Sequence, residues 1–182
     1  MKLLYKVASA AVLSIAIFNV QAKEAYSPSS ASAAMDDAPL VEIRNAKRVF
    51  PGILSGGQPT NEQLEKAKNK GFKTIINLRP VNEHRGGDEE KTVHKLGMNY
   101  INIPVAGASG ITNENSQTLI KALSDKSIYP VMIHCASGNR VGALFALDAA
   151  QRAQLSTEEA INVGKQSGMT RLEGIVRNII EK

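Results

Sequence analysis

Short apolar runs alternate with longer segments of helical periodicity along most of the chain. The apolar runs 73–78, 99–105 and 130–133 have the length and composition of buried strands. Between them lie segments such as the one after Thr112, in which apolar residues gather on one helical face. Strands that alternate with helices are typical of α/β proteins with a mostly parallel central sheet flanked by helices. We therefore predict this fold class.

Local capping signals predict where several helices begin. Three residue pairs have the spacing of a capping box: Thr60 with Gln63, Ser156 with Glu159, and Thr170 with Glu173. A further helix is expected over 88–96, where Gly97 ends it, and another over 140–154. We also predict an edge strand over 41–49 and a short strand over 53–55.

The N-terminus has a different pattern from the rest of the chain. Two lysines precede an uncharged run over 7–20 and small residues near position 22. This pattern is typical of a secretory signal peptide, here 1–22. The run is short for a membrane span, and no cysteine near its end offers a site for a lipid. An uncleaved N-terminal anchor is the alternative.

One domain is expected after the signal peptide. Residues 23–40 are rich in Ser, Ala and Pro and lack an apolar period, which predicts a flexible tether. The remaining 41–182 form the predicted folded domain. We expect a periplasmic or secreted protein without stable membrane insertion after cleavage.

Charge and composition narrow the range of partners. The formal net charge is +5, and removal of 1–22 leaves 20 basic and 17 acidic residues. Because no basic run is interleaved with aromatic residues, no nucleic-acid partner is expected. Three scattered histidines and one cysteine lack the spacing of a metal site, and no cofactor is expected. The oligomeric state stays open.

The only cysteine, Cys135, follows the 130–133 strand and precedes a glycine-bearing loop and the helix that begins at Arg140. Unpaired N–H groups and the helix dipole at such a turn stabilise a thiolate and favour an anionic ligand. Arg140 adds a planar fork that suits two oxygens of one anion. A structural role for Cys135 as a small buried residue is the alternative, but the Ser, Gly and Arg that follow favour a reactive thiolate.

Export constrains this cysteine further. A chain with one cysteine has no partner for an internal disulfide. In an oxidising compartment an exposed thiolate is readily oxidised. We therefore expect Cys135 to lie at the bottom of a pocket or to be kept reduced by a partner.

Ligands of parallel sheets bind beyond the carboxyl ends of the strands. Three predicted loops lie there: 79–87, 106–111 and the loop after Cys135. Arg79 and Arg85 could extend a positive pocket toward a second phosphate or an acidic substrate. Arginines of this kind more often pair with neighbouring surface acids.

Four motifs together carry a resemblance to a known family: Gly56-Gly57-Gln58-Pro59-Thr60, the run from Gly71 to Pro80, Ile103-Pro104-Val105, and His134-Cys135-Ala136-Ser137-Gly138-Asn139-Arg140. The chain resembles the bacterial phosphatase-like family related to dual-specificity protein tyrosine phosphatases, a domain also found in beta-lactamase hydrolase-like proteins. The similarity covers about 49–168. It implies a three-layer cysteine-phosphatase fold and hydrolysis of a phosphorylated protein or small molecule.

The resemblance also implies roles for the residues of the loop. Cys135 would attack phosphorus to form a phosphocysteine, which water would then hydrolyse. Five residues would hold the phosphate oxygens: Ala136, Ser137, Gly138, Asn139 and Arg140. Ser137 would hydrogen-bond the thiolate or assist the second step. His134 would orient the loop, or would only tie neighbouring loops together through its ring nitrogens.

The length of the loop keeps a second chemistry open. Four residues separate Cys135 from Arg140, whereas tyrosine phosphatases usually have five. Rhodanese sulfurtransferases resemble this chain in the length of the loop, and their cysteine carries a persulfide. A non-catalytic module that binds anions or partner proteins is a third interpretation.

The proton donor is also open. Phosphatases of this type usually supply an Asp from the loop after the preceding strand, but 105–110 contains no carboxylate. The nearest acid, Glu114, is expected in the first turn of a helix. The loop 79–87 and the helix start that follows it offer four candidate acids: Glu83, His84, Asp88 and Glu89.

Overall fold

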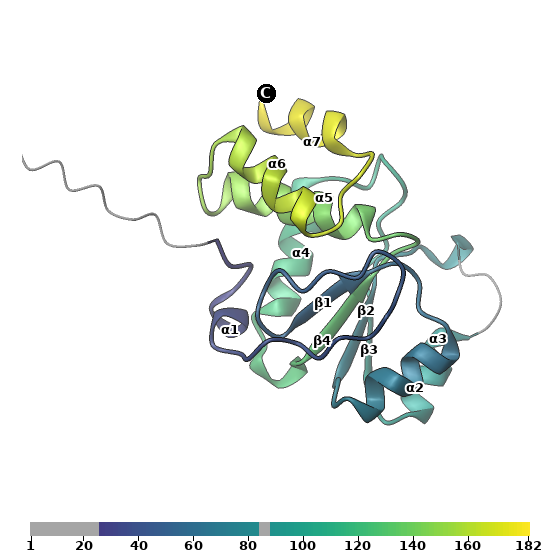
Figure 1. Ribbon diagram of the computed structural model, residues 1–182. Coiled ribbons are helices and arrows are strands. Elements are labelled where there is room, and N and C mark those ends of the chain that lie inside the picture. The colour runs from purple at the N-terminus through teal and green to yellow at the C-terminus, as the bar shows by residue number, and fades with distance from the viewer. Residues whose placement is uncertain (1–25, 84–87) are drawn as a thin grey trace, which may run out of the picture.

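The computed structural model describes residues 26–83 and 88–182. At the centre of this part lies a four-stranded sheet, with β1 (Ile53–Gly56), β2 (Thr74–Asn77), β3 (Asn99–Asn102) and β4 (Val131–His134). The strands lie in the order β1-β4-β2-β3 and pair in parallel (Figure 1). The predicted α/β class with a parallel central sheet is confirmed.

Helices cover both faces of the sheet (Figure 1). One layer holds α4 (Asn113–Leu123), α5 (Asn139–Gln151), α6 (Thr157–Gln166) and α7 (Glu173–Ile180), and the other holds α2 (Asn61–Asn69) and α3 (Glu89–Lys95). Successive strand residues point to opposite faces. Ile76 and Ile133 therefore join the core cluster of α4 and α5, whereas Ile75 and Met132 join that of α2 and α3. The fold has three layers, as the resemblance implies.

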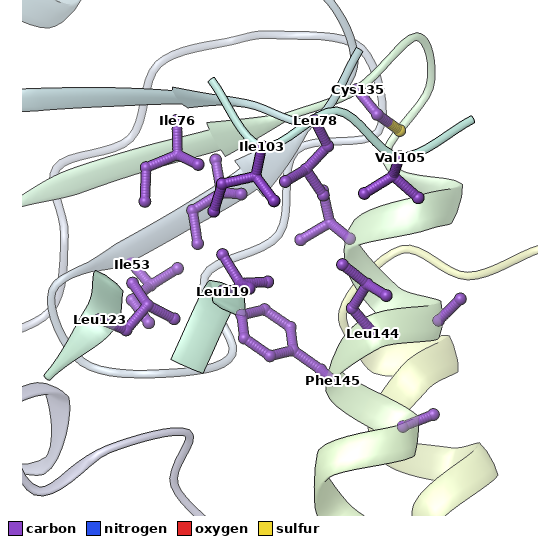
Figure 2. Close-up of a cluster of buried hydrophobic side chains, with 14 of the residues drawn as sticks. Ile53, Ile76, Leu78, Ile103, Val105, Leu119, Leu123, Cys135, Leu144 and Phe145 are labelled. Carbon is purple, nitrogen blue, oxygen red and sulfur yellow. The ribbon is translucent and has the colours of Figure 1, made fainter. Parts of the chain in front are cut away.

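Figure 2 shows the larger core cluster, between the sheet and the pair α4 and α5. Leu119 and Leu123 of α4 and Phe145 of α5 are fully buried there together with Ile53 of β1. Burial of each such side chain stabilises the fold by about 1.5–3 kcal/mol. Cys135 lies at the edge of this cluster, where β4 leads toward α5 (Figure 2). The cysteine is thus placed against a closely packed core.

Some helix starts are set by neighbouring residues and others by residues far away in the sequence. Two of the three predicted capping boxes are confirmed: Thr60 with Gln63 at α2, and Ser156 with Glu159 at α6. The third is wrong, because the N-cap of α7 is Leu172, two residues later, and it makes no side-chain cap. The backbone N–H groups of Thr170 and Arg171 instead donate to Oδ1 of Asn139, at 2.8 and 3.0 Å. This contact holds the chain between α6 and α7 as a loop.

The predicted edge strand over 41–49 is also wrong. The segment makes only one isolated antiparallel bridge, between Lys47 and Ser55. Val41 and Ile43 are buried at alternate positions, which explains the strand-like pattern. Asn45 then takes a left-handed backbone conformation, with φ 53°, which turns the chain out of an extended path.

Residues 26–40 pack against the domain, whereas the composition of 23–40 predicts a flexible tether. They contain the short helix α1 (Ser30–Ala33), in which Ala31 and Ser32 are buried. Serine hydroxyls supply much of the attachment: Ser29 donates to the carbonyl of Leu123 and Ser32 to that of Pro51. Because serine hydroxyls make these contacts, the segment shows no apolar periodicity, and its composition alone predicts a tether.

The predicted signal peptide lies outside the described residues. Across 26–83 and 88–182, none of the helices has both the length and the apolar character needed to cross a membrane. Two short 3₁₀ helices, Val81–Glu83 and Lys126–Ile128, complete the architecture of this part.

Candidate active site

The loop that follows β4 turns sharply into α5. Gly138 precedes the helix with φ 85°, a left-handed conformation that favours glycine. A Cβ atom there would lie 3.0 Å from the side-chain nitrogen of Asn45. That nitrogen donates to the carbonyls of Ser137 and Gly168, both at 3.1 Å. The N–H groups in the first turn of α5 lack intrahelical acceptors, so this turn can receive an anion.

A pocket of about 300 Å³ opens over this turn. Its lining comes from four loops: Glu83, Gly107, Ala108, Cys135, Ala136, Ser137, Asn139, Arg140, Arg171 and Leu172. The three loops predicted at the carboxyl ends of the strands therefore do meet. The fourth loop, between α6 and α7, was not foreseen.

Cys135 lies on the floor of the pocket. It lines the pocket although only 1% of its surface is exposed. Its backbone N–H donates to the carbonyl of Gly56 at 3.3 Å, and Figure 2 shows its side chain beside Leu78 and Val105. Cys135 therefore lies at the bottom of a pocket, one of the two positions predicted for it.

Arg140 shares the pocket and is held by a carboxylate. Its Nη1 and Nη2 donate to the two oxygens of Glu83 at 2.9 and 2.6 Å, and Nη1 also donates to the carbonyl of Val105 at 2.7 Å. Burial lowers the pKa of Arg140, but the hydrogen bond to Glu83 and the charge of Cys135 outweigh this and hold the pKa above its usual value. The guanidinium therefore stays charged, and it already binds both oxygens of a planar anion, the carboxylate of Glu83.

His134 is fully buried and makes a polar network behind the loop. Its Nε2 lies 2.6 Å from Oε1 of Glu89, and its Nδ1 lies 3.4 Å from the carbonyl oxygen of Cys135. Gln58 donates to the other oxygen of Glu89 and accepts from Arg79. His134 thus ties β4 to α3 and to the turn after β1, whichever further role it has.

These features can be compared with known proteins. Residues 40–176 match a family model described as "DSP-PTPase phosphatase fused to NAD+ Kinase". The chain belongs to this family. The resemblance predicted from the four motifs is confirmed, and the phosphatase domain is a tyrosine and dual-specificity phosphatase-like hydrolase.

Curated relatives share part of this domain. It is 31% identical over 120 residues to a beta-lactamase hydrolase-like protein of Xylella fastidiosa, which covers 64% of this chain and 27% of the relative. A protein of the same description from Agrobacterium fabrum is 29% identical over 127 residues, covering 68% and 29%. The chain thus spans less than a third of the length of these relatives.

Solved structures share the fold of the phosphatase domain. The core catalytic domain of the PP-IP phosphatase SIW14 from S. cerevisiae superposes with a TM-score of 0.63 at 16% identity, covering 79% of this chain and 87% of that one. TpbA from P. aeruginosa, solved in complex with pTyr, gives a TM-score of 0.58 at 15% identity, covering 82% and 90%. These likenesses concern the fold alone.

The candidate acids of the phosphatase domain lie in different surroundings. Glu83 lines the pocket, whereas Asp88 caps α3 through a bond from the N–H of Lys91. Burial raises the pKa of Glu89, but the hydrogen bond and charge of His134 and the bond from Gln58 hold it below its usual value. A carboxylate so bound is poorly suited to donate a proton.

Of the remaining candidates, those that the structure describes do not line the pocket. His84 and Arg85 lie outside the described residues. Glu114 is in the first turn of α4, as expected. Arg79 does not line the pocket itself, but it donates to Gln58 and lies 4.0 Å from the carboxylate of Glu83. In the described part of the chain, no group of three or more His, Cys, Asp or Glu side chains is arranged to hold a metal ion.

Two pocket features were missed by sequence reasoning. Arg171 lines the pocket from the α6–α7 loop, and Asn45 links the loop after Cys135 to the same segment. Neither lies in a motif with a chemical signature. A close crossing of α5 and α6 brings the segment near, since a Cβ atom on Gly142 would lie 2.3 Å from the carbonyl oxygen of Gly164.

The variant Glu83→Gln tests the pairing at Arg140. Because the carboxylate of Glu83 competes with incoming anions for the guanidinium, its neutralisation is expected to tighten binding of inorganic phosphate about two- to fivefold. Isothermal titration calorimetry measures this Kd. Glu90→Gln removes an equal charge from the exposed side of α3 and serves as the control. Equal or weaker phosphate binding by Glu83→Gln would show that Glu83 does not compete.

Proposed function

We propose that the chain is an exported, cysteine-dependent phosphatase that hydrolyses phosphomonoesters through a phosphocysteine. The observation that carries this proposal is the pocket in which Cys135 forms the floor and Arg140 holds the two oxygens of a carboxylate. A phosphate group presents oxygens of similar spacing to the same fork. The thiolate then lies on the side from which phosphorus is attacked.

The first step transfers the phosphoryl group to sulfur. The Cys135 thiolate forms a bond to phosphorus while the bond from phosphorus to the leaving oxygen breaks, and that oxygen takes up a proton. Arg140 and the N–H groups of the turn stabilise the charge on the other oxygens. In the second step water attacks phosphorus, the phosphorus–sulfur bond breaks, and inorganic phosphate and the thiolate are released.

Glu83 is the proposed proton donor. Among the described residues that line the pocket, it alone carries a carboxyl group. Substrate oxygens that bind Arg140 displace it from the guanidinium. The freed side chain, which is 35% exposed, lies where it can protonate a leaving oxygen directed toward solvent.

The substrate class is a phosphorylated protein or small molecule. The structural neighbours include a PP-IP phosphatase and a protein bound to pTyr, and the domain shares their fold. A sulfurtransferase is the second candidate, because four residues separate Cys135 from Arg140, the loop length that the rhodanese resemblance implies. In that case Cys135 would carry a persulfide.

A side-by-side assay tests these proposals. The protein is purified under reduction from the periplasmic fraction, where export predicts an N-terminus at Lys23. It is then given an aryl phosphate, or thiosulfate with cyanide. Phosphate release that exceeds sulfur transfer supports the phosphatase. Faster sulfur transfer overturns it in favour of the sulfurtransferase, and a folded protein that binds phosphate with neither reaction is a binding module. The same preparation tests export. A full-length chain retained in the membrane fraction would contradict release after cleavage of the predicted signal peptide.

A further inference from the structure

Arg171 places a second cation in the pocket. It lies in the loop between α6 and α7, has an exposed side chain, and lines the same pocket as Cys135 and Arg140. Neither the motifs of the chain nor the phosphoryl-transfer steps above make use of it.

The backbone of Arg171 is fastened to the cysteine loop. Its N–H donates to Oδ1 of Asn139 at 3.0 Å, and Asn139 directly precedes Arg140. On the other side, Asn45 bridges the carbonyls of Ser137 and Gly168. Two side chains thus hold the α6–α7 loop to the turn that receives phosphate. The backbone of Arg171 is therefore held beside this turn, within reach of a group bound there.

The charge of Arg171 has no carboxylate partner among the described residues, since none lies within 4.0 Å of its guanidinium. The nearest acid in the sequence, Glu173, binds Lys165 at 2.7 Å and Arg177 at 2.9 Å instead. Arg140, by contrast, is already paired with Glu83. Among the cations that line the described pocket, Arg171 is therefore the one that can bind an additional anion without displacing a carboxylate.

The rest of the lining favours a small, highly charged ligand. No aromatic ring lines the described pocket, and Leu172 is its only large apolar side chain. The other lining residues are small or polar, so an aromatic ring would gain few stacking or apolar contacts. A guanidinium, in contrast, binds phosphate oxygens through two parallel hydrogen bonds.

We infer that Arg171 forms a second phosphate subsite, and that the substrate is a small phosphomonoester with a further phosphate group close to the scissile one. This inference rests on the proposed phosphatase function and names its substrate class. The scissile phosphate binds at Cys135 and Arg140, and the second phosphate binds at Arg171.

Binding of inorganic phosphate and pyrophosphate tests the subsite without turnover. In the Cys135→Ser protein, titration calorimetry is expected to give a lower Kd for pyrophosphate than for inorganic phosphate. Adding Arg171→Gln is expected to lower the ratio of the phosphate Kd to the pyrophosphate Kd about tenfold. Arg171→Lys in its place is expected to restore part of this ratio. Lys66→Gln, an exposed position on α2, removes the same charge and is expected to leave the ratio unchanged. A ratio that Arg171→Gln does not alter overturns the subsite.

Turnover then tests the substrate class. The wild-type kcat/KM for a sugar bisphosphate is expected to exceed that for the matching monophosphate, and Arg171→Gln to reduce this preference. A preference that survives in Arg171→Gln overturns the inference, while Cys135-dependent hydrolysis of both esters leaves the phosphatase proposal intact. Hydrolysis of neither ester, with the pyrophosphate effect present, overturns the phosphatase proposal and leaves the anion subsite in place.

Discussion

Replacement of Cys135 by serine is expected to abolish phosphomonoester hydrolysis while binding of inorganic phosphate survives. A serine hydroxyl is not ionised at neutral pH, so the nucleophile is lost, with a fall in kcat on the order of 10⁴-fold or more. Arg140 and the N–H groups of the turn remain, and they hold the phosphate oxygens. Aryl phosphate turnover and the Kd for phosphate measure the two effects separately.

The Cys135→Ser experiment needs a folding control, because the side chain is almost fully buried. Thermal unfolding of both proteins provides it, and retained phosphate binding is a second sign of an intact loop. Hydrolysis by a folded serine variant at more than about one hundredth of the wild-type rate would remove Cys135 from the role of nucleophile. In that case a water molecule activated elsewhere in the pocket would have to attack phosphorus.

Arg140→Lys is expected to weaken binding and catalysis together. Lysine keeps the charge but cannot donate from a planar fork to two oxygens while also bonding the carbonyl of Val105. Loss of donors aimed at the charge of the transition state lowers kcat by about 10²- to 10³-fold. The Kd for phosphate is expected to rise as well, which distinguishes this variant from Cys135→Ser.

Arg152→Lys is the matched control for Arg140→Lys. Arg152 directly follows α5, forms its own bidentate pair with Asp148, and lies outside the lining of the pocket. It is expected to leave kcat/KM within about twofold of wild type, because no part of this pair faces the substrate. A loss in this variant equal to that of Arg140→Lys would attribute the effect to α5 as a whole rather than to the anion-binding fork.

Features encoded by neighbouring residues were predictable from the sequence. Thr60 and Ser156 each find their capping partner three residues later, so two helix starts follow from local spacing alone. The same holds for Cys135 and Arg140, which a single turn of chain brings to one pocket. The placement of Glu83 followed from a general rule, since loops at the carboxyl ends of parallel strands converge.

Features decided by distant residues were not predictable. Thr170 has a good capping signal, yet Asn139, 31 positions earlier, takes its N–H. The strand-like alternation around Ile43 is broken by the left-handed turn at Asn45. Arg171 reaches the pocket only because α6 crosses close to α5. In each case tertiary contacts outweigh a local preference, and one sequence does not reveal such contacts.

The double hydrogen bond of Asn45 also constrains how the site is assembled. This side chain joins carbonyls that are 92 and 123 positions further along the chain. Closing such long loops is entropically costly and occurs late relative to local contacts. The pairing of β1 with β4 joins Ile53 to Val131 and also closes a long loop, whereas the helices need only local contacts. Recovery of activity after dilution from denaturant then reports the joining of the two ends of the domain rather than the formation of helices.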